Sequence, residues 1–279
     1  MMRSFSSAVS GLRSHQTMMD VVANDLANVN TVGYKANRFA FKDSFSQVLR
    51  NAGGAGAGLG SVNAQQVGLG TDTGSIDNLM TQGAVTSTGN PLDLAIQGDG
   101  FFRVTDDAAG FASVQYTRAG NFKLDDAGRL TTQDGYFVVG FTAAPGPPVA
   151  PTATQTTLTI PATARTVNID GAGLVSYVDG AGVTTNVGYV SMAKFPNTAG
   201  LTRSADNRWS QSQASGAPAN GTAGTAGLGT ISSRALEMSN VDMANEFAEM
   251  IKAQRGFQAN SRTITTVDEM LQALTQMKR

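Results

Sequence analysis

The residue types that most often carry catalytic or metal chemistry are sparse in this sequence. His15 is the only histidine, and there is no cysteine. A metal site or general base at His15 would need partner residues at a suitable spacing, and the sequence supplies none. The lack of cysteine excludes disulfides, Fe–S clusters, thiolate zinc sites and cysteine nucleophiles. We therefore expect His15 to be a helix-seam or surface residue, and we expect no metal and no cofactor.

The carboxylates that stand close together fit turns better than active sites. Asp125 and Asp126 belong to an Asp-Asp-Ala-Gly run, which is typical of a hairpin turn. Asp99 lies between Gly98 and Gly100, but the G-x-G-x-x-G spacing and the following helix of a nucleotide site are missing. No G-x-S-x-G elbow is present either. The sequence predicts no catalytic residue and no enzyme activity.

Composition and charge exclude further classes. Charged residues make up only 15% of the chain, the formal net charge is −1, and no basic block is present, so a nucleic-acid partner is not expected. No apolar run approaches the roughly 20 residues of a membrane span, so membrane insertion is not expected. Residues 1–14 lack the apolar region and cleavage site of a secretory signal, so a protein acting outside the cell would need another export route.

The two ends of the chain predict helices with apolar seams. Residues 4–28 contain no proline and one glycine, and an N-cap at Asn240 or Asp242 predicts a second helix over 241–277. In both segments apolar residues recur every seven positions, with a second row three positions behind, as in a coiled-coil seam. The predicted subunit-interface residues are the apolar members of these rows: Phe5, Leu12, Met19, Val22, Leu26, Met243, Met250, Phe257, Ile264, Leu271 and Leu274.

The middle of the chain predicts short strands instead. Alternating patterns occur over 100–104, 136–141, 167–169, 174–178 and 187–195, and hairpins are expected over 104–117 and 122–131. The Gly/Ala-rich runs 51–60 and 213–229 are expected to be flexible joints, and the Pro-rich run 143–151 an extended loop.

These patterns predict an α+β fold. Discontinuous N- and C-terminal helices form a coiled-coil-like inner module, and a central antiparallel β-rich domain lies between them in the sequence. The expected boundaries are 1–30 for the first helix, 31–75 for an extended linker segment, 76–232 for the β-rich domain and 233–279 for the last helix.

Seams at both ends favour assembly. Pairing of the two helices within one chain is the simpler alternative. However, the seams include or border polar residues such as His15, Gln254 and Asn260, and two helices alone cannot bury or pair all of them. Packing in a larger helical array would supply both apolar and amide partners.

Several motifs resemble the bacterial flagellar rod and hook family. They fall in the family's order and span nearly the whole chain. They are residues 9–12 (VSGL), 19–35 (MDVVANDLANVNTVGYK), 39–43 (FAFKD), 82–83 (QG), 93–102 (DLAIQGDGFF), 116–122 (YTRAGNF), 239–242 (SNVD) and 250–261 (MIKAQRGFQANS). One departure is Asp25, where the family more often has asparagine, and this affects only local hydrogen bonding.

The resemblance implies a structural subunit of a tubular helical homopolymer around an export channel, with the terminal helices as the inner layer. It also implies export through the flagellar type III apparatus. Within the family the opening Met1–Phe5 and the closing Gln276–Arg279 favour a short hook protein, which transmits motor torque to the filament in the extracellular hook. The alternative is a distal rod subunit, the straight drive shaft of the basal body. The expected partners are further copies of the chain, adjacent rod and hook–filament junction proteins, the export apparatus and the hook cap.

Two other classes remain open on the residues alone. A surface hydrolase with a β core would need a convergent set of titratable residues, which the sequence does not show. A monomeric adhesin or carbohydrate-binding β module would not need heptads at both ends.

Overall fold

A computed structural model describes residues 2–54, 61–108, 110–111, 113–143 and 154–277. The chain forms two compact units, one helical and one β-rich. The helical unit comprises Met1–Ala27, Asn37–Asn78 and Asp242–Arg279, and the β-rich unit comprises Asn28–Ala36 and Leu79–Val241. Most of the expected joint at 51–60 and of the expected loop at 143–151 lies outside the described residues.

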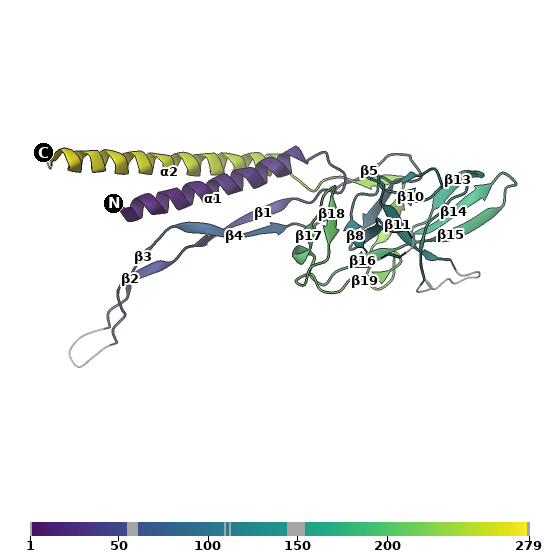
Figure 1. Cartoon of the computed structure of the whole chain (residues 1–279), viewed down its shortest axis with the longest axis horizontal. Coiled ribbons are helices and arrows are strands. Elements are labelled where there is room, and N and C mark those ends of the chain that lie inside the picture. Colours follow the sequence, from purple (N-terminus) through teal and green to yellow (C-terminus); the bar gives the residue numbers. More distant parts are fainter. Residues whose placement is uncertain (1, 55–60, 109, 112, 144–153, 278–279) are drawn as a thin grey trace. The chain divides into compact units, whose positions relative to one another are not determined.

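Two long helices dominate the helical unit. They are α1 (Met2–Ala27) and α2 (Met243–Met277), and they run antiparallel, side by side, with the two chain termini at the same end (Figure 1). The start of α2 is set by Asp242, whose Oδ1 accepts a hydrogen bond from the Ala244 amide at 2.9 Å. The α+β fold with terminal helices in contact and an antiparallel β domain is confirmed.

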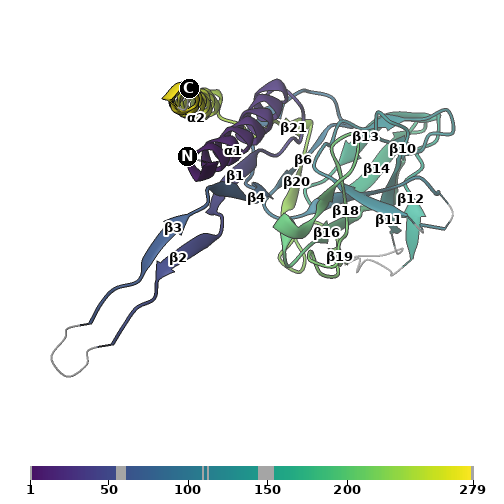
Figure 2. The ribbon, with the colours of Figure 1, turned by 60° about the vertical axis from the view of Figure 1, so that its left-hand side comes forward.

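A long two-stranded ribbon completes the helical unit. Strand β1 (Asn37–Asp43) pairs with β4 (Thr71–Asn78), and farther along the ribbon β2 (Ser46–Arg50) pairs with β3 (Gln65–Gly68), as Figure 2 shows. Phe39 lies opposite Ile76 and packs against the helices, which fixes the inward face of the ribbon. The segment 31–75, expected as one linker, is therefore divided: residues 31–36 belong to the β-rich unit and the rest to the helical unit.

The β-rich unit is built around one large antiparallel sheet. Along the main path its order is β13-β14-β15-β11-β7-β8-β18-β17, and β9, β10, β12, β16 and β19 attach to its side. Two smaller pairs, β20 with β6 and β21 with β5, bring in the last residues before α2. The bounds are β5 (Val85–Ser87), β6 (Leu94–Gln97), β7 (Phe101–Thr105), β8 (Val114–Thr117), β9 (Lys123–Leu124), β10 (Leu130–Thr131), β11 (Phe137–Thr142), β12 (Gln155–Thr157), β13 (Ala164–Ile169), β14 (Leu174–Asp179), β15 (Thr184–Val190), β16 (Met192–Lys194), a 3-10 turn (Thr198–Gly200), β17 (Thr202–Arg203), β18 (Arg208–Ser210), β19 (Ala219–Gly221), β20 (Thr230–Ser233) and β21 (Ala235–Glu237).

Both hairpins expected from the sequence are present. Strand β7 pairs with β8, and β9 pairs with β10 with Leu124 opposite Leu130. The strand expected over 187–195 is divided into β15 and β16 at Ser191, whose carbonyl accepts a hydrogen bond from the Arg103 amide. The change of partner at this residue, from β11 to β7, interrupts the single strand that the apolar pattern suggests.

The core of the β-rich unit draws on nearly every part of its sequence. Its fully buried side chains include Leu94, Phe102, Leu158 and Met192. The Gly/Ala-rich run 213–229, expected to be a flexible joint, contributes β19 and the buried side chains Ala223 and Leu228 to this core. Small residues there allow the chain to pack closely, so composition alone does not indicate flexibility.

Candidate functional site

The described residues contain no group of histidines and acids that could hold a metal ion. Within the same residues, no helix is both long and apolar enough to cross a membrane. Three features stand out in the described residues: the seam between the helices, the exposed apolar surface of the helical unit, and a buried ionic cluster in the β-rich unit.

At two places in the seam between the helices, a glycine makes room for a larger side chain of the other helix. The side chain of Asn260 fills the space beside Gly11, and the ring of His15 fills the space beside Gly256. A Cβ atom at Gly11 would lie 2.7 Å from the Asn260 amide nitrogen, and one at Gly256 would lie 2.3 Å from the His15 ring. On each helix, the glycine and the side chain that fills the partner's hole are four residues apart: Gly11 and His15 on α1, Gly256 and Asn260 on α2. The two holes are therefore reciprocal and set an antiparallel register.

His15 is a packing residue in this seam. Its ring contacts that of Phe41 with centroids 5.1 Å apart, and partial burial lowers the pKa of the imidazole below its ordinary value. The lowered pKa keeps the ring neutral at pH 7, which suits a side chain enclosed by apolar neighbours. The expectation of a seam histidine agrees with this position.

The register leaves the end of α2 unpaired within the chain. With Gly11 opposite Asn260, Met2 lies opposite Glu269, so residues 270–277 have no α1 residue beside them. Met270, Leu271, Leu274 and Met277 are exposed on this overhang. They recur at helical spacing on one side of α2, which is typical of a stripe that binds another surface.

The predicted interface residues divide into three groups by burial. Val22 is buried in the helix seam; Leu12, Met19, Leu26, Met250, Phe257 and Ile264 are half-buried; Phe5, Met243, Leu271 and Leu274 are exposed. The buried positions of α1 are instead Ala8, Gly11, Ser14, Met18, Val22 and Asp25. The contact within the chain is made by Met18, Val22 and Ala253 together with small residues, so most of the predicted interface residues lie beside this contact and not in its centre.

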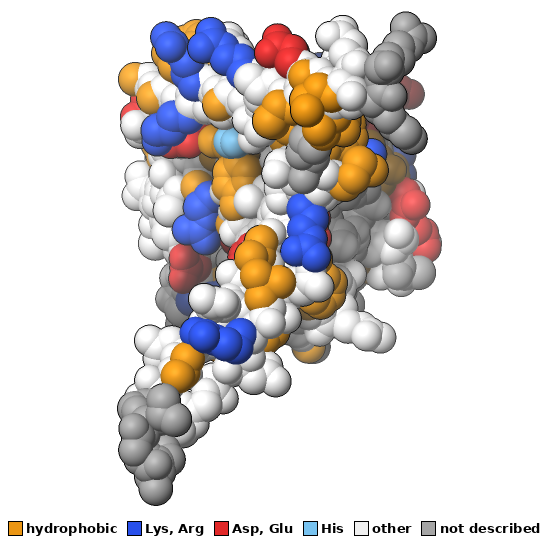
Figure 3. Space-filling view, turned by 90° about the vertical axis from the view of Figure 1, so that its left-hand side faces the viewer, with side chains coloured by type: hydrophobic (Ala, Val, Ile, Leu, Met, Phe, Trp, Pro, Cys, Tyr) orange, Lys and Arg blue, Asp and Glu red, His pale blue; other side chains and the backbone are white. Residues whose placement is uncertain are grey.

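Further apolar surface was missed by the sequence analysis. Phe247 and Ile251 extend the exposed stripe at the start of α2, and Phe45 (84% exposed) and Leu49 lie on the β2–β3 ribbon. In the space-filling view, hydrophobic side chains lie scattered over the face that carries the helix ends and the ribbon (Figure 3). Every residue of β2 and β3 is exposed, and a two-stranded ribbon on its own is marginal in water, so its apolar side chains are available for contact with another molecule.

An acidic cluster lies at the start of α2. Asp25 is fully buried and accepts hydrogen bonds from the Asn37 amide and side chain at 2.7 and 2.8 Å. Burial, then the nearby charges of Asp25, Glu249 and Asp242, raise the pKa of Glu246 to about 6. The Asp25 carboxylate thus has Asn37 as its hydrogen-bond partner. Its negative charge makes ionisation of Glu246 less favourable.

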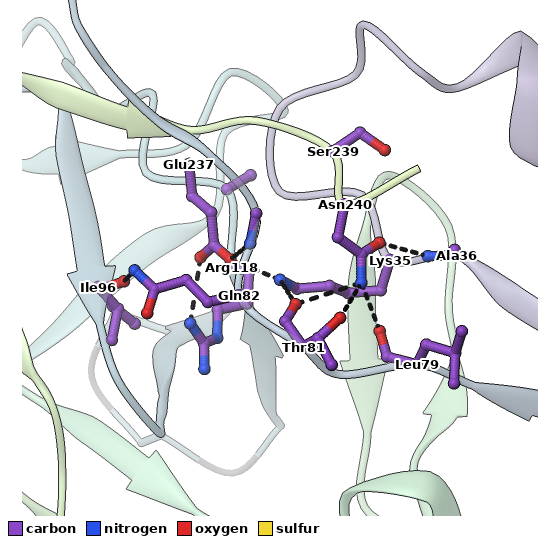
Figure 4. A network of polar contacts seen from close by, with 12 residues as sticks. Lys35, Ala36, Leu79, Thr81, Gln82, Ile96, Arg118, Glu237, Ser239 and Asn240 are labelled. Atoms are coloured by element: carbon purple, nitrogen blue, oxygen red, sulfur yellow. Dashed lines mark hydrogen bonds and ion pairs between the residues drawn. The ribbon is translucent and has the colours of Figure 1, made fainter. Parts of the chain in front are cut away.

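A buried ionic cluster holds the β-rich unit together where the chain enters and leaves it. We call Lys35, Arg118, Glu237 and Asn240 the clamp (Figure 4). The Glu237 carboxylate, which is fully buried, accepts hydrogen bonds from Lys35 Nζ, from Arg118 Nη1 at 3.1 Å and from the Gly83 amide at 3.0 Å. Both carboxylate oxygens are therefore occupied by charged or main-chain donors.

Asn240 ties three stretches of main chain together. Its Oδ1 accepts from the Ala36 amide at 2.8 Å, and its Nδ2 donates to the Leu79 carbonyl at 2.9 Å and to the Thr81 hydroxyl at 2.8 Å. Lys35 Nζ donates to the Thr81 carbonyl at 2.7 Å. These hydrogen bonds therefore hold together three stretches of main chain, at Ala36, at Leu79 and at Asn240.

The electrostatics of the clamp depend on Glu237. Burial lowers the pKa of Lys35, and the second cation, Arg118, lowers it further, whereas Glu237 acts in the opposite direction. Two buried cations share one buried anion, so loss of that anion would leave both without compensation.

The clamp brings together motifs that are far apart in the sequence. Lys35 ends the 19–35 motif, Gly83 closes the 82–83 motif, Arg118 lies within 116–122, and Asn240 within 239–242. Only the contacts in three dimensions bring these segments together.

Three families match parts of the chain. Residues 5–35 match a family described as flagella basal body rod protein, residues 95–177 the flagellar hook protein FlgE/F/G D1 domain, and residues 232–277 the flagellar basal body rod FlgEFG protein C-terminal region.

Relatives along the whole length include rod proteins and a hook protein. The flagellar basal-body rod protein FlgG of Bacillus subtilis is 45% identical over 280 residues, covering 100% of both chains. FlgG of Caulobacter vibrioides is 36% identical over 280 residues, covering 99% of this chain and 100% of its own. The flagellar hook protein FlgE of Borreliella burgdorferi is 28% identical over an alignment of 445 residues, which covers 100% of both chains.

The raised pKa of Glu246 predicts a pH dependence of the helical unit. The group holds its proton more tightly when folded, so its unfavourable contribution is absent below about pH 4.5, the ordinary value, and complete above about pH 6. We expect helix stability, followed by circular dichroism during heating, to fall across this window as pH rises. The Glu246→Gln variant should lose this part of the dependence; an unchanged profile in the variant would contradict the assignment.

Removing the anion of the clamp should strongly destabilise the β-rich unit. In Glu237→Gln, Lys35 and Arg118 stay buried without their counter-charge, which typically costs about 3–5 kcal/mol. Denaturant unfolding followed by the fluorescence of Trp209, a buried residue of this unit, measures the loss. Glu249→Gln, at a partly exposed acid of α2, is the control and should change stability by less than about 0.5 kcal/mol.

Proposed function

Because this chain belongs to the family of flagellar basal-body rod and hook proteins, a family of structural axial proteins and not of enzymes, we propose that it is a subunit of the distal rod. The observation that carries the proposal is length. The chain aligns end to end with FlgG proteins, whereas the hook relative needs an alignment far longer than the chain. A hook protein of that kind has additional sequence that has no counterpart here.

This proposal replaces the hook assignment that the two ends of the sequence favoured. The hook cap and the hook–filament junction proteins, expected as partners of a hook subunit, are not carried over. The chain would lie in the basal-body rod, next to other axial flagellar proteins and to further copies of itself. Export through the flagellar type III apparatus, without a cleaved signal, remains part of the proposal.

The exposed apolar stripes support polymerisation. Phe5, the apolar side chains of the α2 overhang and those of the β2–β3 ribbon are exposed in the part of the chain that the structure describes. Covering one large apolar side chain is worth about 1.5–3 kcal/mol, so several such contacts per subunit suffice to drive assembly. The predicted seam residues would then have two roles: the half-buried ones hold α1 to α2, and the exposed ones bind neighbouring copies.

The ribbon supports a rod rather than a bending tube. Its exposed apolar side chains belong to paired strands, which are stiffer than a Gly-rich linker of the same length. A ribbon inserted between neighbouring subunits would limit their sliding, and torque could then pass along a straight shaft. Within each subunit, the clamp would carry load between the strands that lead to the helical unit.

Imaging of the purified polymer tests the proposal. We expect straight, stiff tubes in electron micrographs, with residues 43–54 and 61–70 ordered against neighbouring subunits. Curved tubes whose subunit spacing differs between the inside and outside of the bend would restore the hook assignment. A chain that stays monomeric at high concentration would rule out both.

A charge on the α2 overhang should block assembly without unfolding the subunit. Leu274→Asp places a carboxylate on an exposed apolar position, where burial against a neighbour becomes costly. We expect no tubes, with monomer stability within about 0.5 kcal/mol of the parent. Gln276→Asp adds the same charge at an exposed polar position of the same helix and should assemble. Normal tubes from Leu274→Asp would exclude this residue from the interface.

A further inference from the structure

The β-rich unit has one prominent apolar knob, at the turn between β14 and β15. Val183 is 60% exposed, well above the other exposed large hydrophobic residues described in this unit, Val85 and Leu124. A Cβ atom built at Gly180 or Gly182 meets nothing within 4 Å, so these two positions of the turn are open among the described residues. We call residues 179–183 the tip.

The tip is rigid enough to act as a knob. The Asp179 amide donates to the Val183 carbonyl at 3.0 Å, and the Gly182 amide donates to the Asp179 carbonyl at 2.9 Å. The Asp179 side chain accepts from the Gly180 amide at 2.6 Å, which leaves its other carboxylate oxygen available. The tip thus presents a fixed valine next to a negative charge.

The same unit contains a pocket of about 210 Å³ with complementary chemistry. Met80, Phe101, Phe195 and Pro196 supply the apolar part of its lining, and Asp99 and Lys194 belong to the polar part. Arg118 also lines the pocket, and its Nε atom is buried without a hydrogen-bond partner in the described part of the chain. A main-chain carbonyl entering with an apolar side chain would give this nitrogen an acceptor.

Lys194 is placed to receive a carboxylate. It donates to Asp99 at 2.8 Å and to the Gly227 carbonyl at 3.3 Å, and both side chains of the ion pair are partly exposed. An exposed pair of this kind is weak, so Lys194 can take a second acidic partner at little cost. The charges of Lys194 and Asp179 therefore match.

The tip cannot fill the pocket of its own chain. In Figure 1 the β14–β15 hairpin projects at one end of the β-rich unit, away from β16, whose last residue is Lys194. Two different surfaces that bind each other between copies make a heterologous contact, which repeats as an open chain instead of closing as a dimer.

We propose that the tip of one copy inserts into this pocket of the next, with Val183 between the apolar walls and Asp179 paired with Lys194. The occupant of the pocket is thus a second copy of this chain. The inference rests on the proposed polymerisation and adds to it a head-to-tail contact between β-rich units, separate from the helical seams.

Because the chain has no cysteine, a designed pair can report this contact directly. Val183→Cys and Thr198→Cys, in one full-length chain, place one thiol on the tip and one at the rim of the pocket. In assembled, oxidised protein we expect a ladder of disulfide-linked dimers, trimers and longer chains on a non-reducing gel. A mixture of the two single variants should stop at dimers, because each copy then carries one thiol.

A matched control tests whether the cross-link is specific. Leu124→Cys with Thr198→Cys has the same number of thiols, but the first lies on another exposed apolar position, and no ladder should form. Tubes that assemble but give no ladder from the tip and pocket pair would overturn the contact and leave the proposed function intact. Dimers alone from the double variant would show an isologous contact and also overturn it. Chains that never assemble would remove the proposed function and this contact together.

A charge at the tip gives an independent measure. Val183→Glu should raise the critical concentration for assembly by about tenfold or more, since it removes burial of one valine. The tip is exposed, so the unfolding midpoint should not change. Leu124→Glu is the control for added charge and should assemble like the parent; equal assembly of both variants would contradict insertion of the tip.

Discussion

The burial of one carboxylate between two cations constrains much of this structure. Glu237 lies on β21, and its partners Lys35 and Arg118 come from segments about two hundred and one hundred and twenty residues away in the chain. A buried anion without these donors would be unstable, so the three segments must meet if the β-rich unit is to form. Asn240 extends this requirement to Ala36 and Leu79. The chain passes to the helical unit after Ala36 and after Val241, and it returns from that unit at Leu79. These points lie at or next to residues that Asn240 joins.

The helical unit is governed by a different constraint, the space between its helices. Gly11 and Gly256 permit a close approach that Asn260 and His15 fill, and the contact therefore consumes few large apolar side chains. Those side chains remain half-buried or exposed along α1, α2 and the ribbon. A unit that leaves many large apolar side chains exposed is suited to a subunit, because that surface can be buried between copies.

Much of this architecture could be predicted without coordinates. Seven-residue repeats identified both helices, and of the two caps predicted for the second one, Asn240 and Asp242, the structure has Asp242. Turn residues located the hairpins around 106–110 and 125–128, where local chemistry determines the backbone. The ribbon was not predicted, because its strands pair across an intervening Gly-rich run and the residues of β2 and β3 are exposed, so they carry no buried-face pattern. The ordered role of residues 213–229 was also missed, since glycine and alanine favour flexible and tightly packed segments alike.

The sequence by itself determined the element types, the lack of catalytic chemistry and the resemblance to axial flagellar proteins, because these depend on residue types and on spacing along the chain. Only the tertiary structure decided which side of each helix is covered, since a hydropathy pattern does not distinguish a seam within one chain from a seam between copies. It also decided that Lys35, Arg118, Glu237 and Asn240 form one cluster. Their charges can be buried only as a group, and no local pattern in the sequence records contacts between residues so far apart.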